Sequence, residues 1–332
     1  MIGQIMKLDR GFPLVKLEDG RMLRCKHAVD LVKNASTRAV IGDKVRLLLE
    51  DDLDTAQILE ILPRNQVLIR RDPAERTQPQ LLAANFDLIM VVHPLSELNV
   101  SRLERELVLA YETKAEVAVV LTKADLVSGE EQVREVQDAV AELVADIPVL
   151  VVSEDDPASV EAVRELIGSK LTVLLGRSGV GKSTLINLLV GEEVQSTTPV
   201  RETDGKGRHT TVSREMVTLP GGGCVIDMPG IRGIGLWDAT DGIAAAFADI
   251  EGLAQACRFD DCRHEAEPGC AVQAAVEEGS LSVRRLEAYK RLRNENEANQ
   301  QANQIAQRTK ERRGHPRTRG QSNHGKRVRP RK

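Results

Sequence analysis

The sequence predicts a multidomain protein with a small N-terminal β-barrel, a central α/β domain and a C-terminal α-helical domain that ends in a disordered basic tail. Three observations support this. Short strands separated by turns fill residues 1–63, and apolar strands alternate with helices over residues 86–226, but no strand pattern follows residue 238. We expect these boundaries: barrel 1–71, linker 72–80, α/β domain 81–236, helical domain 237–311 and tail 312–332.

The barrel is predicted from five short strand-like stretches, IGQIMKL, FPLVKL, RMLRC, DKVRLLLE and TAQILEILPR. Asp19-Gly20 is a typical hairpin turn, because glycine tolerates a positive φ angle. An SH3-like barrel would have the same pattern, so the strands alone do not decide the barrel type. The polar stretch DPAERTQPQ that follows, with its two prolines, is typical of a linker.

The central domain is predicted from continuous apolar runs. Buried strands of this kind, separated by helices, indicate a parallel sheet. The strands are expected at Phe86–His93, Glu116–Leu121, Val149–Val152, Leu171–Leu175 and Gly223–Ile226, and the helices near 101–113, 130–145 and 158–168.

The net charge of −4 divides unevenly along the chain. Residues 301–332 hold 11 basic residues and one acidic residue, a net charge of +10, so the first 300 residues carry −14. A basic tail on an acidic body favours a polyanionic partner, nucleic acid first.

No apolar run approaches the about 18 residues that a membrane helix needs, and the N-terminus lacks a secretory h-region. We therefore expect a cytoplasmic protein without a membrane partner.

A phosphate-binding loop occupies residues 176–183 and fits the pattern GxxxxGK[ST]. It lies between a buried strand and a helix, the context that this motif requires. Backbone N–H groups and the helix N-terminus would bind phosphate, Lys182 would reach the β- and γ-phosphates, and the Ser183 hydroxyl would ligate Mg²⁺. The predicted nucleotide contacts here are Gly176, Arg177, Ser178, Gly179, Val180, Gly181, Lys182, Ser183 and Thr184.

Two further motifs indicate a guanine nucleotide. Thr122-Lys123-Ala124-Asp125 ends a strand and matches [NT]KxD, in which the Asp125 carboxylate accepts hydrogen bonds from guanine and Lys123 lies over the base. Asp227-Met228-Pro229-Gly230 fits DxxG, so Asp227 would hold Mg²⁺ through water and the Gly230 N–H would sense the γ-phosphate. Ser153, after another strand, is expected in the last guanine-contacting loop.

A magnesium-binding threonine is expected in the loop that contains His209-Thr210-Thr211. Either Thr210 or Thr211 would complete the Mg²⁺ shell, and the sequence does not separate them. The motifs follow the order TKAD, VVS, phosphate loop, HTT and DxPG, whereas the phosphate loop of an ordinary GTPase comes first. This order predicts a circularly permuted GTPase domain.

With these motifs in this order, residues 1–290 resemble the ribosome small-subunit-dependent GTPase A (RsgA) family. The resemblance implies an N-terminal OB-fold, a circularly permuted GTPase and a C-terminal zinc domain. It implies a late assembly factor that binds the 30S subunit and its 16S rRNA, hydrolyses GTP to GDP and phosphate there, and then leaves. We expect this factor to be a monomer.

The zinc ligands are expected at Cys257, Cys262, His264 and Cys270. Three thiolates and an imidazole form a closed tetrahedral set for one structural Zn²⁺. The spacing differs from that of common CxxC fingers, so the assignment rests mainly on the resemblance.

The catalytic group is the least defined part of the site. Ile231 stands where Ras-like enzymes place a water-orienting glutamine, and a hydrocarbon cannot orient water, so intrinsic hydrolysis should be slow. His209 is a candidate, although it can equally just shape its loop. The catalytic set is therefore Lys182, Thr210, Thr211, His209 and Gly230.

A helix is expected over residues 280–311. Its portion from Asn294 to Gln307 is rich in Asn and Gln and lacks an apolar stripe, so we expect it to fray. The tail beyond it would bind rRNA phosphates in a salt-dependent way.

Two other function classes remain open. One is a P-loop ATPase or small-molecule kinase, which TKAD argues against. The other is an RNA-binding scaffold in which the nucleotide is only structural, and this would show no turnover.

Overall fold

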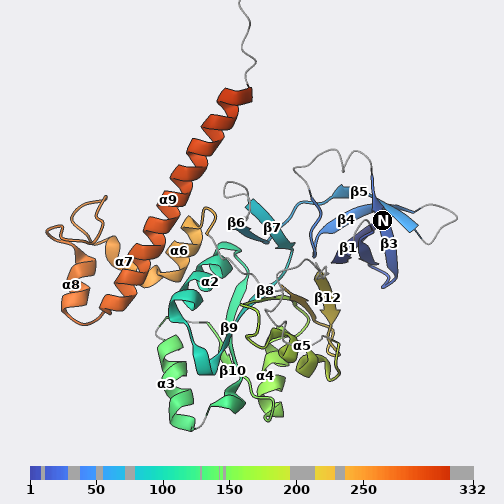
Figure 1. Cartoon of the computed structure of the whole chain (residues 1–332), viewed down its shortest axis with the longest axis horizontal. Helices are drawn as coiled ribbons and strands as arrows, with labels where there is room; N and C mark the ends of the chain where they lie inside the picture. Colours follow the sequence, from blue (N-terminus) through green and yellow to red (C-terminus); the bar gives the residue numbers. More distant parts are fainter. Residues whose placement is uncertain are drawn as a thin grey trace, which may run out of the picture.

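The computed structural model describes most of the chain up to residue 314 (Figure 1). The described ranges are 1–8, 12–28, 38–49, 55–71, 79–127, 129–141, 143–144, 147–194, 214–228 and 236–314. Most of the predicted tail, from residue 315 onward, lies outside them. The prediction that this tail is disordered therefore stays a prediction.

The N-terminal barrel contains the five predicted strands, β1 (Ile2–Leu8), β2 (Leu14–Leu17), β3 (Met22–His27), β4 (Lys44–Leu49) and β5 (Thr55–Ile61). They pair in the closed order β1-β2-β3-β5-β4-β1, in which β3 and β5 are parallel and the other pairs antiparallel. A closed five-stranded barrel with this order is an OB-fold. Alternate residues such as Ile5, Val15 and Ile58 are fully buried in its core.

A hairpin connects the barrel to the central domain. It consists of β6 (Val67–Arg71) and β7 (Pro79–Ala84), which pair antiparallel, so Pro79 and Gln80 of the expected linker begin a strand. Gly42 lies against this hairpin with a φ of 85°, and a Cβ atom there would lie 2.0 Å from the Ala84 carbonyl oxygen. Arg64 pairs with the fully buried Asp43 beside this contact. The barrel is thus closely packed on the hairpin.

The central sheet has the order β10-β9-β8-β11-β13-β12. Five strands are parallel and were predicted: β8 (Leu88–Pro94), β9 (Glu116–Thr122), β10 (Val149–Val151), β11 (Leu171–Leu175) and β13 (Cys224–Asp227). The antiparallel strand β12 (Arg214–Thr218) was not predicted. It also pairs with β1 of the barrel, at Lys7 opposite Glu215, so one continuous sheet joins the two domains.

Helices cover both faces of this sheet, as the apolar strands require. They are the short helices η1 (Leu95–Glu97) and η2 (Ala124–Leu126) and the longer helices α2 (Val100–Glu112), α3 (Glu130–Ala141), α4 (Pro157–Ile167) and α5 (Lys182–Val190). Helices α4 and α5 share one apolar cluster, which includes Val163, Ile167 and Ile186. Helix α2 belongs to a larger cluster on the other face, which continues into the C-terminal domain.

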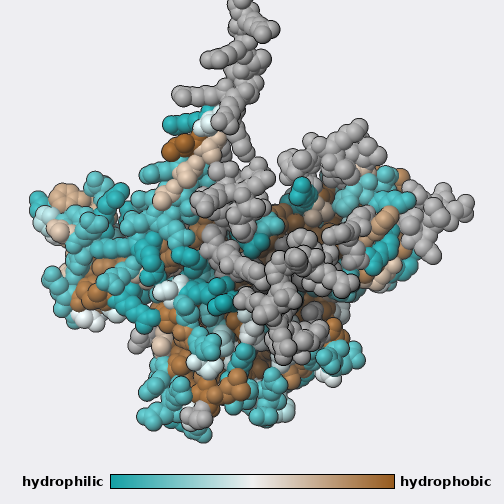
Figure 2. All heavy atoms as spheres, viewed as in Figure 1, coloured by the Kyte–Doolittle hydropathy of each residue, from teal (hydrophilic) through white to brown (hydrophobic). Residues whose placement is uncertain are grey.

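The C-terminal domain consists of α6 (Thr240–Ala246), α7 (Ala248–Ala254), α8 (Ala271–Glu277) and α9 (Val283–Gly314). Helix α9 begins against the body of the molecule and then projects away from it (Figure 1). The expectation that Asn294–Gln307 frays is wrong, because this portion is helical throughout. Hydrophilic residues cover most of α9 on the face seen in Figure 2. None of the helices in the described ranges combines the length and the apolar composition that a membrane span requires.

Candidate nucleotide and metal sites

The predicted phosphate loop joins the end of β11 to the start of α5. Gly179 and Gly181 have φ angles of 84° and 100°, which other residues rarely adopt. A Cβ atom on Gly176 would lie 2.5 Å from the Val92 carbonyl oxygen of β8. Glycines are therefore needed here for both backbone conformation and close approach, as a loop that wraps a phosphate requires.

The buried Lys182 and the half-buried Asp227 form a charged centre beside this loop. The Lys182 ammonium donates to the carbonyl oxygens of Gly176 (3.0 Å) and Arg177 (3.1 Å). Burial lowers the pKa of Lys182, and the Asp227 carboxylate opposes that shift. Burial likewise raises the pKa of Asp227, opposed by the Lys182 charge. Parallel pairing of β11 with β13 sets Leu174 beside Asp227 and so brings the two groups together.

The residues present fit a magnesium ion. Asp227 Oδ1 is buried and has no hydrogen-bond partner among the described residues. Buried acceptors are normally paired, so this oxygen can bind a cation or a donor. Ser183 lies in the first turn of α5, next to Lys182. A carboxylate and a hydroxyl beside a phosphate loop are oxygen ligands of the kind that Mg²⁺ prefers.

The TKAD segment is bonded directly to the phosphate loop. The Thr122 hydroxyl donates to the backbone oxygen of Val180, and the Lys123 ammonium donates to the Gly179 carbonyl oxygen at 2.7 Å. Lys123 has a φ of 60°, which turns the chain at the end of β9. Asp125 follows in η2 with an exposed side chain, free to meet a base from solvent.

The loop with Ser153 lies beside TKAD. The Ala124 N–H donates to the Val152 carbonyl oxygen (3.2 Å), and the Ser153 N–H donates to the Ser159 hydroxyl (3.2 Å). The carboxyl ends of β9, β10, β11 and β13 therefore bring the predicted motifs to one edge of the sheet. This edge is where open parallel sheets bind ligands.

Four predicted site residues lie outside the described ranges: His209, Thr210, Thr211 and Gly230. Their roles stay predictions. Thr184 is half-buried in the first turn of α5, and Arg177, Ser178 and Gly179 are exposed at the top of the phosphate loop.

The sequence did not indicate a buried polar group at the end of β8. His93 Nε2 lies 2.6 Å from Glu106 Oε2, and Arg102 donates to the other oxygen of Glu106 at 2.8 Å. Glu106 is fully buried. Its negative charge acts on Lys182 and favours the protonated form. No local motif could have revealed this group, because its members belong to a strand and a helix.

The four predicted cysteine and histidine ligands lie together in the C-terminal domain. Their ligand atoms are all within 4.8 Å of one another. Cys257 Sγ lies 3.9 Å from Cys270 Sγ and 3.7 Å from His264 Nδ1. Two thiolates about 2.3 Å from a tetrahedral Zn²⁺ would be about 3.8 Å apart. The cluster can therefore hold a metal ion, and the described residues need little movement to do so.

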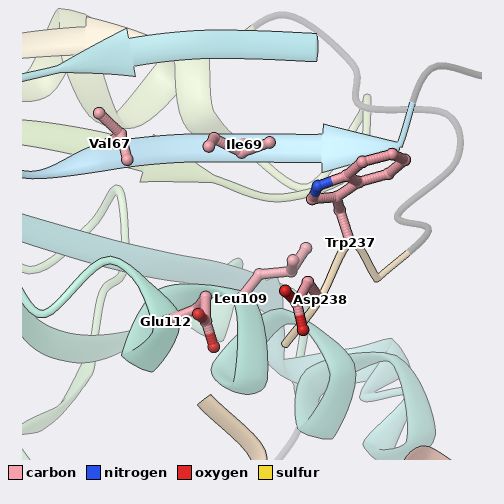
Figure 3. Close-up of a pocket in the computed structure, with 6 residues that line it drawn as sticks. All are labelled: Val67, Ile69, Leu109, Glu112, Trp237 and Asp238. Atoms are coloured by element: carbon pink, nitrogen blue, oxygen red, sulfur yellow. The ribbon is translucent and has the colours of Figure 1, made fainter. Parts of the chain in front are cut away.

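An open cavity of about 230 Å³ lies away from the phosphate loop, between β6, α2 and the segment before α6 (Figure 3). Its lining residues are Val67, Ile69, Leu109, Glu112, Trp237 and Asp238. Figure 3 shows the Trp237 ring beside the end of β6.

Comparison with known proteins identifies the family. The family model described as RsgA GTPase matches residues 61–237. The small ribosomal subunit biogenesis GTPase RsgA of Streptomyces avermitilis is 42% identical over 90% of this chain and 80% of its own length. A relative of the same name from Methanosarcina acetivorans is 41% identical over 77% of this chain and 69% of its own length.

Solved structures agree with this fold. A crystal structure of YjeQ from Thermotoga maritima matches with a TM-score of 0.68 and 25% identity, over 89% of this chain and 98% of that one. A crystal structure of YloQ, a circularly permuted GTPase, matches with a TM-score of 0.65 over 90% of this chain and 95% of that one; at 24% identity it supports the fold alone. The fold, the motif order and the relatives agree, and the chain belongs to the RsgA family of circularly permuted GTP hydrolases.

Proposed function

We propose that this GTPase binds the 30S ribosomal subunit late in its maturation, hydrolyses GTP there and is then released. The observation that carries the proposal is the 42% identity, over most of the chain, to a small ribosomal subunit biogenesis GTPase. The hydrogen bond from Lys123 to the phosphate loop supports binding of a guanine nucleotide, because it places the TKAD segment, expected to contact the base, next to the loop expected to bind the phosphates.

The phosphate loop N–H groups and Lys182 bind the β- and γ-phosphates in this proposal. Asp125, with Ser153 nearby, selects guanine, because a carboxylate accepts from the N1 and N2 groups that adenine lacks. Ser183, Asp227 and one of Thr210 and Thr211 hold Mg²⁺, which supplies charge neutralisation between the phosphates when bound. The Gly230 N–H senses the γ-phosphate.

The water-activating group is either His209 or a group that the subunit supplies. Ile231 has no polar atom with which to orient water. We therefore propose slow turnover in the free protein and faster turnover on the subunit.

The remaining proposals concern partners and metals. The Cys₃His set holds one structural Zn²⁺, and the basic tail contacts 16S rRNA phosphates. The protein acts in the cytoplasm as a monomer, with no membrane partner, and its domains have the limits expected from the sequence.

The test is GTP turnover with and without purified 30S subunits. We expect stimulation by the subunit, loss of turnover in Lys182→Ala, and binding of GDP without binding of ADP. Lys44→Ala, an exposed lysine on β4, is the matched control and should behave like the wild type. No stimulation by intact subunits would contradict the proposed function, and ADP binding would favour the kinase or ATPase class.

A further inference from the structure

Helix α9 holds the segment that follows the DMPG motif. The segment Leu236–Thr240 is the first described stretch after Met228, and it leads into α6. Three amide side chains on one face of α9 bond to it: Asn296, Asn299 and Gln300. They lie in the portion of α9 that has no apolar stripe, and we call them the amide clasp.

The clasp bonds both backbone and side-chain groups of the segment. Asn296 Oδ1 accepts from the Ala239 N–H at 2.9 Å, and its amide donates to the Thr240 hydroxyl at 3.1 Å. The Asn299 amide donates to the Leu236 carbonyl oxygen at 3.3 Å. These bonds are shielded from water, because Asn296 and Asn299 are only 5% and 9% exposed.

Gln300 completes the clasp at the most constrained residue of the segment. Its amide donates to Asp238 Oδ1 at 2.7 Å and to the Thr240 hydroxyl at 3.1 Å. Asp238 has a φ of 42°, in the left-handed region that residues with a Cβ atom adopt uncommonly, although aspartate does so more readily than most. The bond from Gln300 helps to hold Asp238 in this conformation.

The clasp is itself fixed to the GTPase domain. Arg291 of α9 pairs with the buried Glu104 of α2 at 2.7 Å, and Arg105 of α2 pairs with Glu295 of α9. The α9 members of both ion pairs, Arg291 and Glu295, lie just before the clasp residues along the helix. The segment is therefore bonded to a helix that cannot shift without breaking contacts to α2.

We propose that Asn296, Asn299 and Gln300 are positioning residues for GTP hydrolysis. They fix Leu236–Thr240 in one place, and Gly230 lies only six residues before Leu236 in the sequence. The inference rests on the proposed role of the Gly230 N–H as the γ-phosphate sensor, because the clasp would act on hydrolysis through that residue. The clasp would matter little for GDP, which is held by the phosphate loop and TKAD.

Packing alone would not require these residues. Apolar side chains at the same positions of α9 would bury the same surface, whereas a buried amide is costly unless its hydrogen bonds are satisfied. Satisfied amides fix the relative position of the two elements, because each amide must stay within hydrogen-bonding distance of its partners in the segment. The clasp therefore fixes where the segment Leu236–Thr240 lies on α9 and adds little to the stability of the interface.

The chain contains its own reporter for this segment. Trp237 is its one tryptophan. It lies inside the segment and lines the open cavity, so a small quencher can reach it (Figure 3). Quenching of its fluorescence by acrylamide measures how firmly the segment is held.

The experiment compares Asn296→Ala and Asn299→Ala with Asn294→Ala, an exposed asparagine of the same helix. In the full-length protein, we expect each clasp variant to lower kcat for GTP by about tenfold, because a small misplacement of a group that contacts the γ-phosphate costs rate. We expect KM and the Kd for GDP to change by less than about threefold. Acrylamide quenching of Trp237 should rise in the clasp variants and stay unchanged in Asn294→Ala.

Rescue and folding controls keep the test decisive. Asn296→Asp keeps the acceptor for the Ala239 N–H but loses the donor to the Thr240 hydroxyl and buries a charge, so its kcat should lie between those of Asn296→Ala and the wild type. Rates are taken per GDP-binding site, so a poorly folded fraction is excluded. A wild-type kcat, or a lower kcat with unchanged quenching of Trp237, would overturn the proposal.

The measurement uses basal turnover without ribosomes, so it is independent of the proposed 30S function. If the subunit did not stimulate turnover, the clasp proposal would still stand. If the clasp variants had the wild-type kcat, the proposed 30S function would still stand.

Discussion

The nucleotide edge of the sheet and the interface between α9 and the GTPase domain are built in different ways. At the nucleotide edge, short motifs follow buried strands, and backbone pairing of β11 with β13 sets Asp227 opposite Leu174, close enough to the phosphate loop for the charges of Asp227 and Lys182 to interact. At the α9 interface, charged and amide side chains from distant parts of the chain meet, as in the pairs Arg291–Glu104 and Asn296–Ala239. The first is positioned by the sheet and the second by side-chain hydrogen bonds.

This difference predicts how each region responds to substitution. Substitutions at the nucleotide edge should abolish GTP hydrolysis with little effect on the free energy of unfolding, since the sheet is stabilised by apolar packing. Changes at the α9 interface should alter stability or rate moderately, because each side chain there contributes one or two bonds. The following predictions test this division, from the largest expected effect to the smallest.

Replacing Lys182 by alanine should lower GTP turnover at least about 100-fold, because the variant loses a charge aimed at the phosphates. The free energy of unfolding should change little or rise, since burial disfavours the charged form of Lys182. Turnover and thermal unfolding of the same preparation check both parts. A large fall in the free energy of unfolding would contradict the division, because it would show that Lys182 also stabilises the core of the sheet.

Replacing Cys262 by serine should remove the bound metal and unfold the C-terminal domain, because metal binding and folding of such sites are one equilibrium. We expect a loss of about 3 kcal/mol or more in that domain, with the Kd for GDP nearly unchanged. Metal analysis and unfolding followed by circular dichroism check this. Cys224→Ser, a half-buried cysteine outside the cluster, should keep its metal; metal loss there would argue against the assigned ligands.

Replacing Arg291 by alanine should destabilise the α9 interface by about 1–3 kcal/mol, because Glu104 stays buried without its partner. Arg134→Ala is the matched control, since Arg134 and its partner Glu130 are largely exposed. It should change stability by less than about 0.5 kcal/mol. Equal effects of the two variants on urea unfolding would refute the importance of this buried pair.

Replacing Glu112 by glutamine should change the pH dependence of stability. Burial raises the pKa of Glu112, and Asp241 and Asp238 add to the shift, although the Gly242 N–H bond opposes it. The folded state therefore binds this proton more tightly than the unfolded state, so stability is lost as pH rises from 4.5 through the raised pKa. Glutamine keeps an acceptor for Gly242 without the charge.

We expect the melting temperature of Glu112→Gln to exceed that of the wild type at neutral pH, and the difference to shrink as the solution becomes more acidic. Melting curves between about pH 4 and pH 8 check this. A difference that grows toward acid pH would mean that the shift has the opposite sign.

The parts predicted from sequence are those with local signals. Continuous apolar runs revealed β8, β9 and β11, since strands buried on both faces must be apolar along their length. The phosphate loop and the four metal ligands were found because their members lie close together in sequence. The resemblance selected the OB-fold, and the parallel pairing of β3 with β5 bears it out.

The parts that sequence did not reveal depend on distant partners. Strand β12 is short and carries the exposed Glu215, and it is stabilised by backbone pairing with β13 and β1. Residues 294–307 have no apolar stripe, yet they are helical, and up to Gln300 amides such as Asn296 bond to a segment more than fifty residues away. No local pattern encodes such a partner.

The most direct test of the account is the base specificity of Asp125→Asn. The account assigns the Asp125 carboxylate to the N1 and N2 donors of guanine, and asparagine would offer a donor that suits the carbonyl of xanthine instead. We predict that the Kd for GDP rises by about a hundredfold or more, while xanthosine diphosphate binds better to the variant than to the wild type. Unchanged binding of both nucleotides would contradict the assignment of this sheet edge as a guanine site.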